Sequence, residues 1–197
     1  MFNPGRGYKN EFRIIAGQWR RRRLKFSPLP GVRPSPDRVR ETLFNWLQHS
    51  VGGARCLDLF AGSGALGLEA LSRGAASVLF VDRERQIVET LRTHLDVLNA
   101  PNGAVLQSDA LAYLRGPPQA FDIVFLDPPF TSSELLKESA DALERYGWLA
   151  GQARIYVEYP LGTKLVLPDA WELIRESHAG RVGFALARQA SVKLAQD

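Results

Sequence analysis

The sequence of 197 residues contains a single cysteine, Cys56, and only three histidines. One cysteine excludes an internal disulfide and any zinc cluster built on several thiolates. The histidines His49, His94 and His178 lack the spacing of metal ligands, so no metal site is predicted. The sequence also lacks a signal peptide and any apolar run long enough to cross a bilayer. We therefore expect a soluble, cytoplasmic and monomeric protein that needs neither a metal nor a membrane.

Acidic residues are scarce at the start of the chain. Residues 1–40 contain 11 Lys or Arg but only two acids, Glu11 and Asp37, whereas the rest of the chain has 14 bases and 19 acids. Residues 1–40 therefore carry a net charge of about +9 and the rest of the chain about −5. This asymmetry is typical of a basic segment that binds a polyanion. A solvated tail without a partner is the alternative. We expect residues 1–35 to form a basic arm, with a short strand over residues 12–16, and residues 36–197 to form the main domain.

Hydrophobic spacing divides the main domain into alternating helices and strands. Val39, Leu43, Trp46 and Leu47 recur at helical spacing. After Gly53, short apolar runs alternate with helical segments, as in an open α/β sheet with crossover helices. Strands are predicted over residues 56–60, 77–81, 104–107, 121–126, 154–159, 171–177 and 182–188. A turn signal joins the last two strands. The prediction is a mostly parallel, seven-stranded sheet that ends in an antiparallel hairpin, and further helices are expected over 64–73, 84–98, 110–114 and 133–146.

A glycine-rich turn follows the first of these strands, with Gly62, Gly64 and Gly67 leading into a helix. Glycines let the backbone approach a ligand closely, and the helix start offers free N–H groups, so this turn is predicted to bind a cofactor. The spacing also fits the dinucleotide motif, which leaves a nicotinamide- or flavin-dependent oxidoreductase as an alternative. The carboxylate of Asp58 beside the turn would repel a pyrophosphate but accommodate a cationic methionine group. We therefore favour S-adenosylmethionine as the cofactor.

Two further acids follow strands of the same sheet. Asp82 is placed to accept hydrogen bonds from both hydroxyls of a ribose, in either cofactor class. Asp109, or the backbone beside it, is placed to meet the adenine amino group. For each acid, a helix N-cap or a solvated loop position is the alternative. The predicted cofactor-binding residues are Asp58, Phe60, Ala61, Gly62, Ser63, Gly64, Gly67, Asp82, Arg83, Asp109 and Ala110.

The predicted strand 121–126 leads directly into Asp127, Pro128, Pro129 and Phe130. Two prolines fix the backbone and remove two N–H donors, which leaves a stiff loop of outward carbonyls beside a carboxylate. Asp127 and the Pro128 carbonyl are placed to bind the two hydrogens of an exocyclic amine on a nucleic-acid base, and Phe130 to stack on that base. Catalysis would then come from orientation and electrostatics. A simple turn after the strand is the alternative for this segment.

Four segments of the sequence, 13–20, 33–46, 58–70 and 127–130, closely resemble the bacterial ribosomal small-subunit methyltransferase D family. The resemblance covers nearly the whole chain and implies a Rossmann-like class I S-adenosylmethionine methyltransferase fold. It also implies methyl transfer to N2 of one guanine of 16S rRNA, nucleotide 966 in the family's usual numbering, on the small ribosomal subunit or a late assembly intermediate. The sequence departs from the family at Arg21, where the family often has glycine.

The resemblance gives the basic arm an RNA partner. Arginines contact phosphates and position a protein on RNA without reading its sequence. The predicted RNA-binding residues are Arg13, Arg20, Arg21, Arg22, Arg23, Arg33, Arg38 and Arg40. The same chemistry on another nucleic acid, such as adenine N6 of DNA or a different rRNA guanine, remains open, and so does a non-catalytic RNA-binding module.

Overall fold

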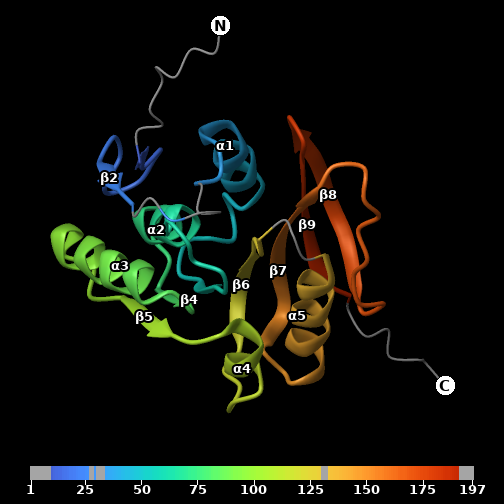
Figure 1. The fold of residues 1–197 in the computed structure, drawn as a ribbon. Helices are drawn as coiled ribbons and strands as arrows, with labels where there is room; N and C mark the ends of the chain where they lie inside the picture. The colour runs from blue at the N-terminus through green and yellow to red at the C-terminus, as the bar shows by residue number, and fades with distance from the viewer. Residues whose placement is uncertain (1–9, 27–28, 30–33, 130–132, 191–197) are drawn as a thin grey trace, which may run out of the picture.

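The computed structural model of the chain describes residues 10–26, 29, 34–129 and 133–190. The main sheet consists of β3 Arg55–Asp58, β4 Ser77–Asp82, β5 Gly103–Gln107, β6 Phe121–Leu126, β7 Leu149–Pro160, β8 Trp171–Ala179 and β9 Val182–Gln189. Its seven strands follow the order β5-β4-β3-β6-β7-β9-β8 (Figure 1). Strands β3 to β7 pair in parallel, whereas β9 runs antiparallel to both β7 and β8. This arrangement confirms the predicted parallel sheet with its C-terminal antiparallel hairpin.

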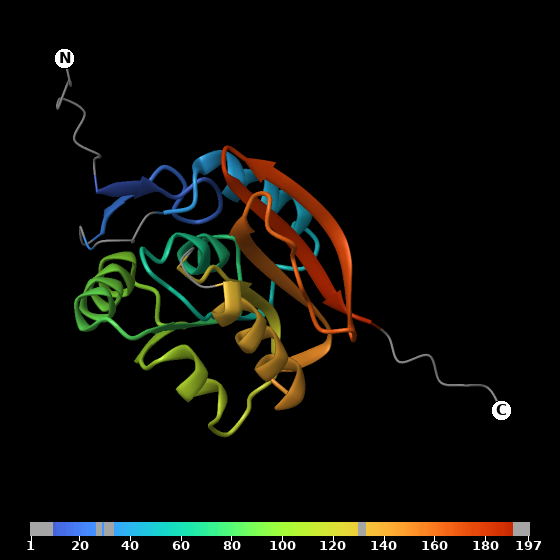
Figure 2. The same cartoon turned by 45° about the vertical axis from the view of Figure 1, so that its right-hand side comes forward.

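Helices cover both faces of the sheet, as the two views in Figures 1 and 2 show. These helices are α1 Asp37–Trp46, α2 Ala65–Ser72, α3 Arg85–Leu98, α4 Ala110–Leu114 and α5 Ser133–Arg145. The apolar residues of α1, α2 and α3 form one core cluster with alternate residues of the strands, such as Cys56 and Phe125. Those of α4 and α5 form a second cluster with the intervening residues, such as Leu57 and Val124. The period of two along each strand therefore assigns every side chain to one face.

Local sequence accounts for where the helices begin and end. Helix α1 starts after Pro36, and Asp37 in its first turn interacts favourably with the helix dipole. Helix α3 ends at Leu98, and the cap residue Asn99 adopts a left-handed backbone conformation with φ of 50°. All eight residues of α2 are buried, because this short helix lies between the sheet and the N-terminal part of the chain.

A two-stranded hairpin, β1 Glu11–Arg13 and β2 Arg23–Lys25, precedes the main sheet. The sequence predicted only one strand here, over residues 12–16; β2 was missed because it has one apolar residue in three. Phe12, Ile14 and Leu24 of the hairpin are buried in the same core cluster as Val39. The hairpin therefore packs onto the main domain beside α2 and α3, as both views show (Figures 1 and 2).

The turn of this hairpin contains Arg21 with φ of 68°, in the left-handed region that favours glycine. Its N–H donates to the Ile14 carbonyl at 2.8 Å, and the Ile14 N–H donates to the Arg22 carbonyl at 2.8 Å. A hydrogen-bonded turn therefore forms with arginine at this position. The arginine adopts the backbone conformation that a glycine would adopt at less cost.

None of the helices in the described part of the chain is long and apolar enough to cross a membrane. Two residues with predicted roles, Arg33 and Phe130, lie outside the described residues.

Candidate active site

Four acidic side chains share one face and one edge of the sheet. Asp58, Asp82 and Glu158 lie at or near the carboxyl ends of β3, β4 and β7, and Asp127 directly follows β6. In each strand the acid is two residues from a member of the core cluster that faces α1, α2 and α3. The pleat therefore directs all four acids to that face. The carboxyl edge of a parallel sheet is the usual ligand site of open α/β folds.

The glycine loop between β3 and α2 is held against the neighbouring strand. The Ala61 N–H donates to the Val81 carbonyl at 3.0 Å, and the Gly62 N–H donates to Oδ2 of Asp82 at 2.9 Å. Gly64 precedes α2 with φ of 78°, and a Cβ built on it would lie 2.3 Å from Cδ2 of Leu91. Only glycine fits this position, because a side chain would be strained there and would also collide.

The Asp58 carboxylate is buried beneath α2, with an exposed fraction of 2%. Its Oδ2 accepts a hydrogen bond from the Gly67 N–H at 3.0 Å, in the first turn of the helix. Burial raises the pKa of Asp58 to about 8, and the nearby Asp82 acts in the same direction. A cationic neighbour would favour the ionised form of this carboxyl, so its role beside a cationic methionine group stays a prediction.

Asp82 fixes the loop from the next strand. Its Oδ2 accepts from Gly62 and its Oδ1 from the Glu84 N–H, both at 2.9 Å. Burial raises the pKa of Asp82, and these two hydrogen bonds oppose the shift. Each oxygen keeps a second lone pair for a ligand hydroxyl. The neighbouring Arg83 is exposed and forms an ion pair with Glu84 at 3.2 Å.

The remaining predicted cofactor-binding residues lie in the glycine loop and at the start of α4. Phe60 is half-buried, and Ala61 and Ser63 are buried; the Ser63 hydroxyl accepts from the Ala65 N–H at 3.3 Å. Asp109 is exposed and caps α4, since its Oδ1 accepts from the Ala112 N–H at 3.0 Å. The cap uses one carboxylate oxygen of Asp109, so contact of this side chain or of the backbone beside it with adenine stays a prediction.

Asp127 is half-buried where β6 ends, Pro128 is buried and Pro129 is exposed. Burial raises the pKa of Asp127 well above its ordinary value; Glu158 and Asp58 raise it further, and a hydrogen bond from Ser35 opposes them. Three carboxyls in one place cannot all ionise easily, because like charges at short range in a poorly solvated site repel strongly. The site therefore favours a positively charged or hydrogen-bond-donating partner.

Sequence reasoning missed Glu158, Ser35 and Tyr156. Glu158 is 4% exposed, and its Oε1 accepts from the Ser35 hydroxyl at 2.8 Å and from the Tyr156 hydroxyl at 2.7 Å. Since β6 and β7 pair Leu126 with Val157, Glu158 lies at the level of Asp127 on the neighbouring strand. One signal was available: Glu158 is the only acid in the otherwise apolar strand segment 155–159.

The basic residues of the hairpin are mostly exposed. Arg20, Arg21 and Arg22 lie on the surface around the hairpin turn. The side chain of Arg23 is 65% exposed and pairs with Glu11 at 2.7 Å, and that of Arg13 is 48% exposed and pairs with Asp37 at 2.9 Å. Arg38 is also exposed. These positions are compatible with phosphate contacts.

Arg40 is different, because its side chain is fully buried. The guanidinium donates to the Ser35 carbonyl at 3.2 Å, to the Arg13 carbonyl at 2.9 Å and to Asp37 at 2.6 Å. The third nitrogen, Nη1, lies 3.7 Å from Oε2 of Glu69, which is also fully buried. The prediction that Arg40 is an RNA-binding residue is therefore wrong.

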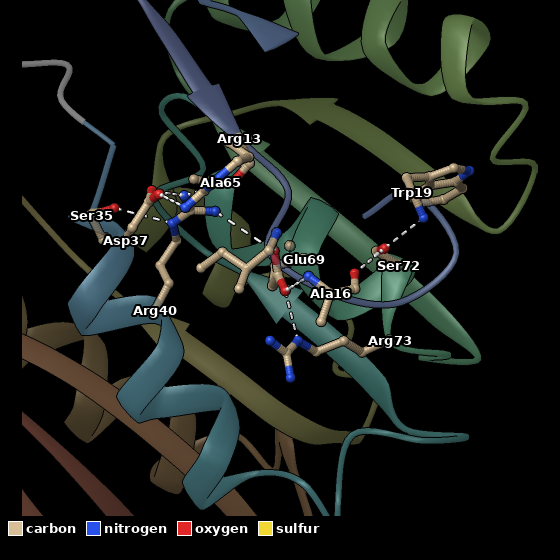
Figure 3. A network of polar contacts seen from close by, with 12 residues as sticks. Arg13, Ala16, Trp19, Ser35, Asp37, Arg40, Ala65, Glu69, Ser72 and Arg73 are labelled. Atoms are coloured by element: carbon tan, nitrogen blue, oxygen red, sulfur yellow. Dashed lines mark hydrogen bonds and ion pairs between the residues drawn. The ribbon is translucent and has the colours of Figure 1, made fainter. Parts of the chain in front are cut away.

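Figure 3 shows how Arg40 and Glu69 join the hairpin to α1 and α2. Glu69, in α2, accepts from the backbone N–H of Ile15 at 2.7 Å and of Ala16 at 3.0 Å. It also accepts from Arg73 at 2.7 Å. One turn further along α2, the Ser72 hydroxyl accepts from the Trp19 N–H at 3.0 Å and donates to the Ala16 carbonyl at 2.6 Å. The segment between β1 and β2 is thus fixed to the helix that follows the glycine loop.

Comparisons with known proteins agree with this architecture. Residues 12–188 match the family model described as Conserved hypothetical protein 95. The chain is 46% identical to ribosomal RNA small subunit methyltransferase D of Escherichia coli strain K12, over 94% of each chain. It is 41% identical to the protein of the same name from Haemophilus influenzae, over 90% of this chain and 94% of the relative.

A solved structure, yhhF from Escherichia coli, superposes with a TM-score of 0.85 at 46% identity and covers 91% of this chain and 98% of that chain. The predicted Rossmann-like methyltransferase fold is confirmed. The chain belongs to the Conserved hypothetical protein 95 family and is a relative of the ribosomal RNA small subunit methyltransferases D.

Proposed function

We propose that the protein transfers a methyl group from S-adenosylmethionine to the exocyclic N2 amine of a specific guanine in 16S rRNA. The observation that carries the proposal is the position of Asp127 and Pro128 beside Asp58 and the glycine loop, on one face of one sheet edge. A base amine held by the first pair lies next to a methyl donor held by the second. The names of the relatives support an rRNA substrate.

The side chains around the loop fit the proposed cofactor. Asp82 has free lone pairs for the two ribose hydroxyls, and Asp58 supplies negative charge for the cationic methionine group. Gly62 and Gly64 keep the backbone close to the ligand, with φ of 50° and 78°. When bound, S-adenosylmethionine supplies an electrophilic methyl group. A pyrophosphate would meet the buried Asp58 instead of free N–H donors, which disfavours a dinucleotide.

The chain's own residues then activate the amine. The lone pair of a base amine is delocalised into the ring, which makes the nitrogen a poor nucleophile. Hydrogen bonds from its two hydrogens to the Asp127 carboxylate and the Pro128 carbonyl favour the pyramidal form, in which the lone pair is localised. Pro128 and Pro129 fix the loop, so little reorganisation is needed at the moment of reaction. Phe130 is proposed to stack on the base, and a stacked base must first be turned out.

The direct test is transfer of a tritiated methyl group to small subunits from a strain that lacks this modification. We expect label on guanine N2 of 16S rRNA, identified after digestion to nucleosides. Label on another nucleoside would redirect the proposal to a different acceptor, and transfer to free rRNA but not to subunits would exclude a late assembly substrate. No transfer to either would refute the proposal.

Two variants separate chemistry from binding. Asp127→Ala should abolish transfer while the affinity for S-adenosylhomocysteine, measured by calorimetry, is retained. Asp82→Ala should weaken that affinity. Asp122→Ala is the matched control, because Asp122 lies on the same strand but pairs with Arg55 at 3.2 Å, away from the catalytic edge. Near-normal turnover of Asp127→Ala would contradict the amine-binding mechanism.

The basic hairpin is proposed to position the RNA, with residues 1–35 as the RNA-binding arm. Serine substitutions at Arg20, Arg21, Arg22 and Arg23 should weaken binding. The slope of log affinity against log salt should fall by about 0.7 to 0.9 for each phosphate that the variant no longer neutralises. An unchanged slope would show that these arginines do not bind phosphates.

A further inference from the structure

The catalytic edge contains a buried hydrogen-bonded chain that the proposed mechanism does not yet use. The Tyr156 hydroxyl donates to Oε1 of Glu158 at 2.7 Å, and the Ser35 hydroxyl is bonded to the same oxygen at 2.8 Å. Asp127 lies at the level of Glu158 on the neighbouring strand, and hydrogen bonding by the same Ser35 hydroxyl lowers the pKa of Asp127. One serine hydroxyl therefore connects the carboxyl that faces the substrate site with a second carboxyl behind it.

The side chains around these hydrogen-bonded groups come from the neighbouring strands and from α1. Strand β3 contributes Asp58, β7 contributes Tyr156, and β9 places the apolar Phe184 opposite Glu158. Helix α1 contributes Arg40, which donates to the carbonyl of Ser35 and to other groups. Within the described residues, no cation is bonded to either Asp127 or Glu158.

Two carboxyls that are connected in this way and lack a cation share a proton, because charging both costs more than charging one. Glu158 is 4% exposed, whereas Asp127 is half-buried, so the charge is less costly on Asp127. The Ser35 hydroxyl can accept from one carboxyl while it donates to the other. The proton can thus change sides with no movement of the heavier atoms.

We propose that Glu158 is a positioning residue that holds the shared proton through Ser35, so that Asp127 meets the target amine as a carboxylate. This inference rests on the proposed function. As the nitrogen bonds to the methyl carbon, the carbon–sulfur bond breaks and its electron pair stays on sulfur. The nitrogen, now positive, gives one proton to Asp127. The half-buried Asp127 then releases that proton to water, and Glu158 keeps its own.

Glu158→Gln tests the assignment, because an amide resembles a protonated carboxyl and still bonds to both Ser35 and Tyr156. The variant removes the second carboxyl on which the shared negative charge can lie, so that only Asp127 can carry it. At alkaline pH we expect turnover within about threefold of the wild type, because Asp127 is ionised in both proteins and the amide keeps the hydrogen bonds that position it. The acid limb of the pH profile of kcat/KM should move to lower pH by about one unit or more.

Ser35→Ala provides the second variant and should act in the opposite direction. It removes a hydrogen bond that lowers the pKa of Asp127, so the acid limb should move to higher pH. Ser35→Thr keeps a hydroxyl and should restore the wild-type profile. Glu176→Gln is the matched control, because Glu176 also accepts a hydrogen bond from a tyrosine hydroxyl, that of Tyr159, on the other side of β7. Its profile should equal that of the wild type.

A purely structural role for Glu158 would change unfolding temperatures but would not shift the two pH profiles in opposite directions. If wild-type protein methylates subunits and Glu158→Gln leaves the acid limb unmoved, the inference is overturned while the proposed function stands. Absence of transfer by the wild type would refute the function itself, so the two failures are distinguishable.

Discussion

Replacement of Arg40 by methionine tests whether this residue stabilises the fold or binds RNA. Methionine keeps much of the aliphatic stem and removes only the guanidinium. The change leaves the carbonyls of Ser35 and Arg13 without their donors, at former distances of 3.2 and 2.9 Å. It also removes the cation that lies 3.7 Å from the fully buried Glu69. Buried polar groups without partners are costly, so the variant should be less stable.

The size of the effect follows from what Glu69 retains. Removal of one partner from a buried ion pair costs about 3 to 5 kcal/mol. Glu69 keeps Arg73 and the backbone N–H groups of Ile15 and Ala16, which places the expected loss near the lower limit, about 3 kcal/mol. For a domain of this size, that loss lowers the unfolding temperature by roughly 6 to 12 °C.

The assay is urea and thermal unfolding of Arg40→Met beside Arg38→Met. Arg38 is exposed on the same helix, so its replacement should change stability by no more than about 0.5 kcal/mol. The reasoning would be refuted if Arg40→Met were as stable as the wild type and if it reduced the salt dependence of RNA binding. That combination is the signature of a surface arginine on a phosphate.

Three further changes test single features of the fold. Arg21→Gly should stabilise the protein by about 1 kcal/mol in urea unfolding, because glycine adopts a φ of 68° without steric cost; a loss of stability would contradict this. Gly67→Ala places a Cβ 2.3 Å from Phe80 and 3.0 Å from Asp58, and should cost about 1 to 3 kcal/mol and weaken cofactor binding in calorimetry. Burial raises the pKa of Asp58 to about 8, so the folded state binds the proton of this carboxyl more tightly than the unfolded chain does. The free energy of unfolding therefore falls as the pH rises from about 4 to about 8. Asp58→Asn should therefore gain stability relative to the wild type across that window, and a difference independent of pH would refute the shift.

The sheet edge with its acids could be predicted because it follows from two regular patterns. Apolar runs locate the strands, and the period of two then directs residues such as Asp58 and Asp82 to one face. The glycine loop and Asp127 could be placed for the same reason, since each directly follows a strand. These features depend only on residues that are close in sequence.

The rest depends on contacts between distant residues. Glu158 obtains its role from Ser35, which is 123 positions away. Charged residues are usually exposed, so the sequence near Arg40 does not show that its side chain is buried. The cost of burial is offset by Ser35 and Asp37 nearby and also by distant partners, Arg13 on β1 and Glu69 on α2. Asp109 looks equivalent to Asp82 in sequence, yet it caps a helix. Pattern alone cannot rank a cap above a ligand contact when both follow a strand.

The hairpin is both basic on its surface and packed on the core, which the basic composition of this segment does not show. In β2 the order is Arg23 exposed, Leu24 buried and Lys25 exposed, so one face carries charge and the other packs on the core. Buried Phe12 and Ile14 and the hydrogen bonds to Glu69 hold the backbone in place without using the exposed arginine side chains of the turn. A basic surface that is already ordered loses less conformational entropy on binding than a free tail would. We therefore infer that the hairpin presents its arginines to RNA in a fixed position relative to α2, and through α2 relative to the glycine loop.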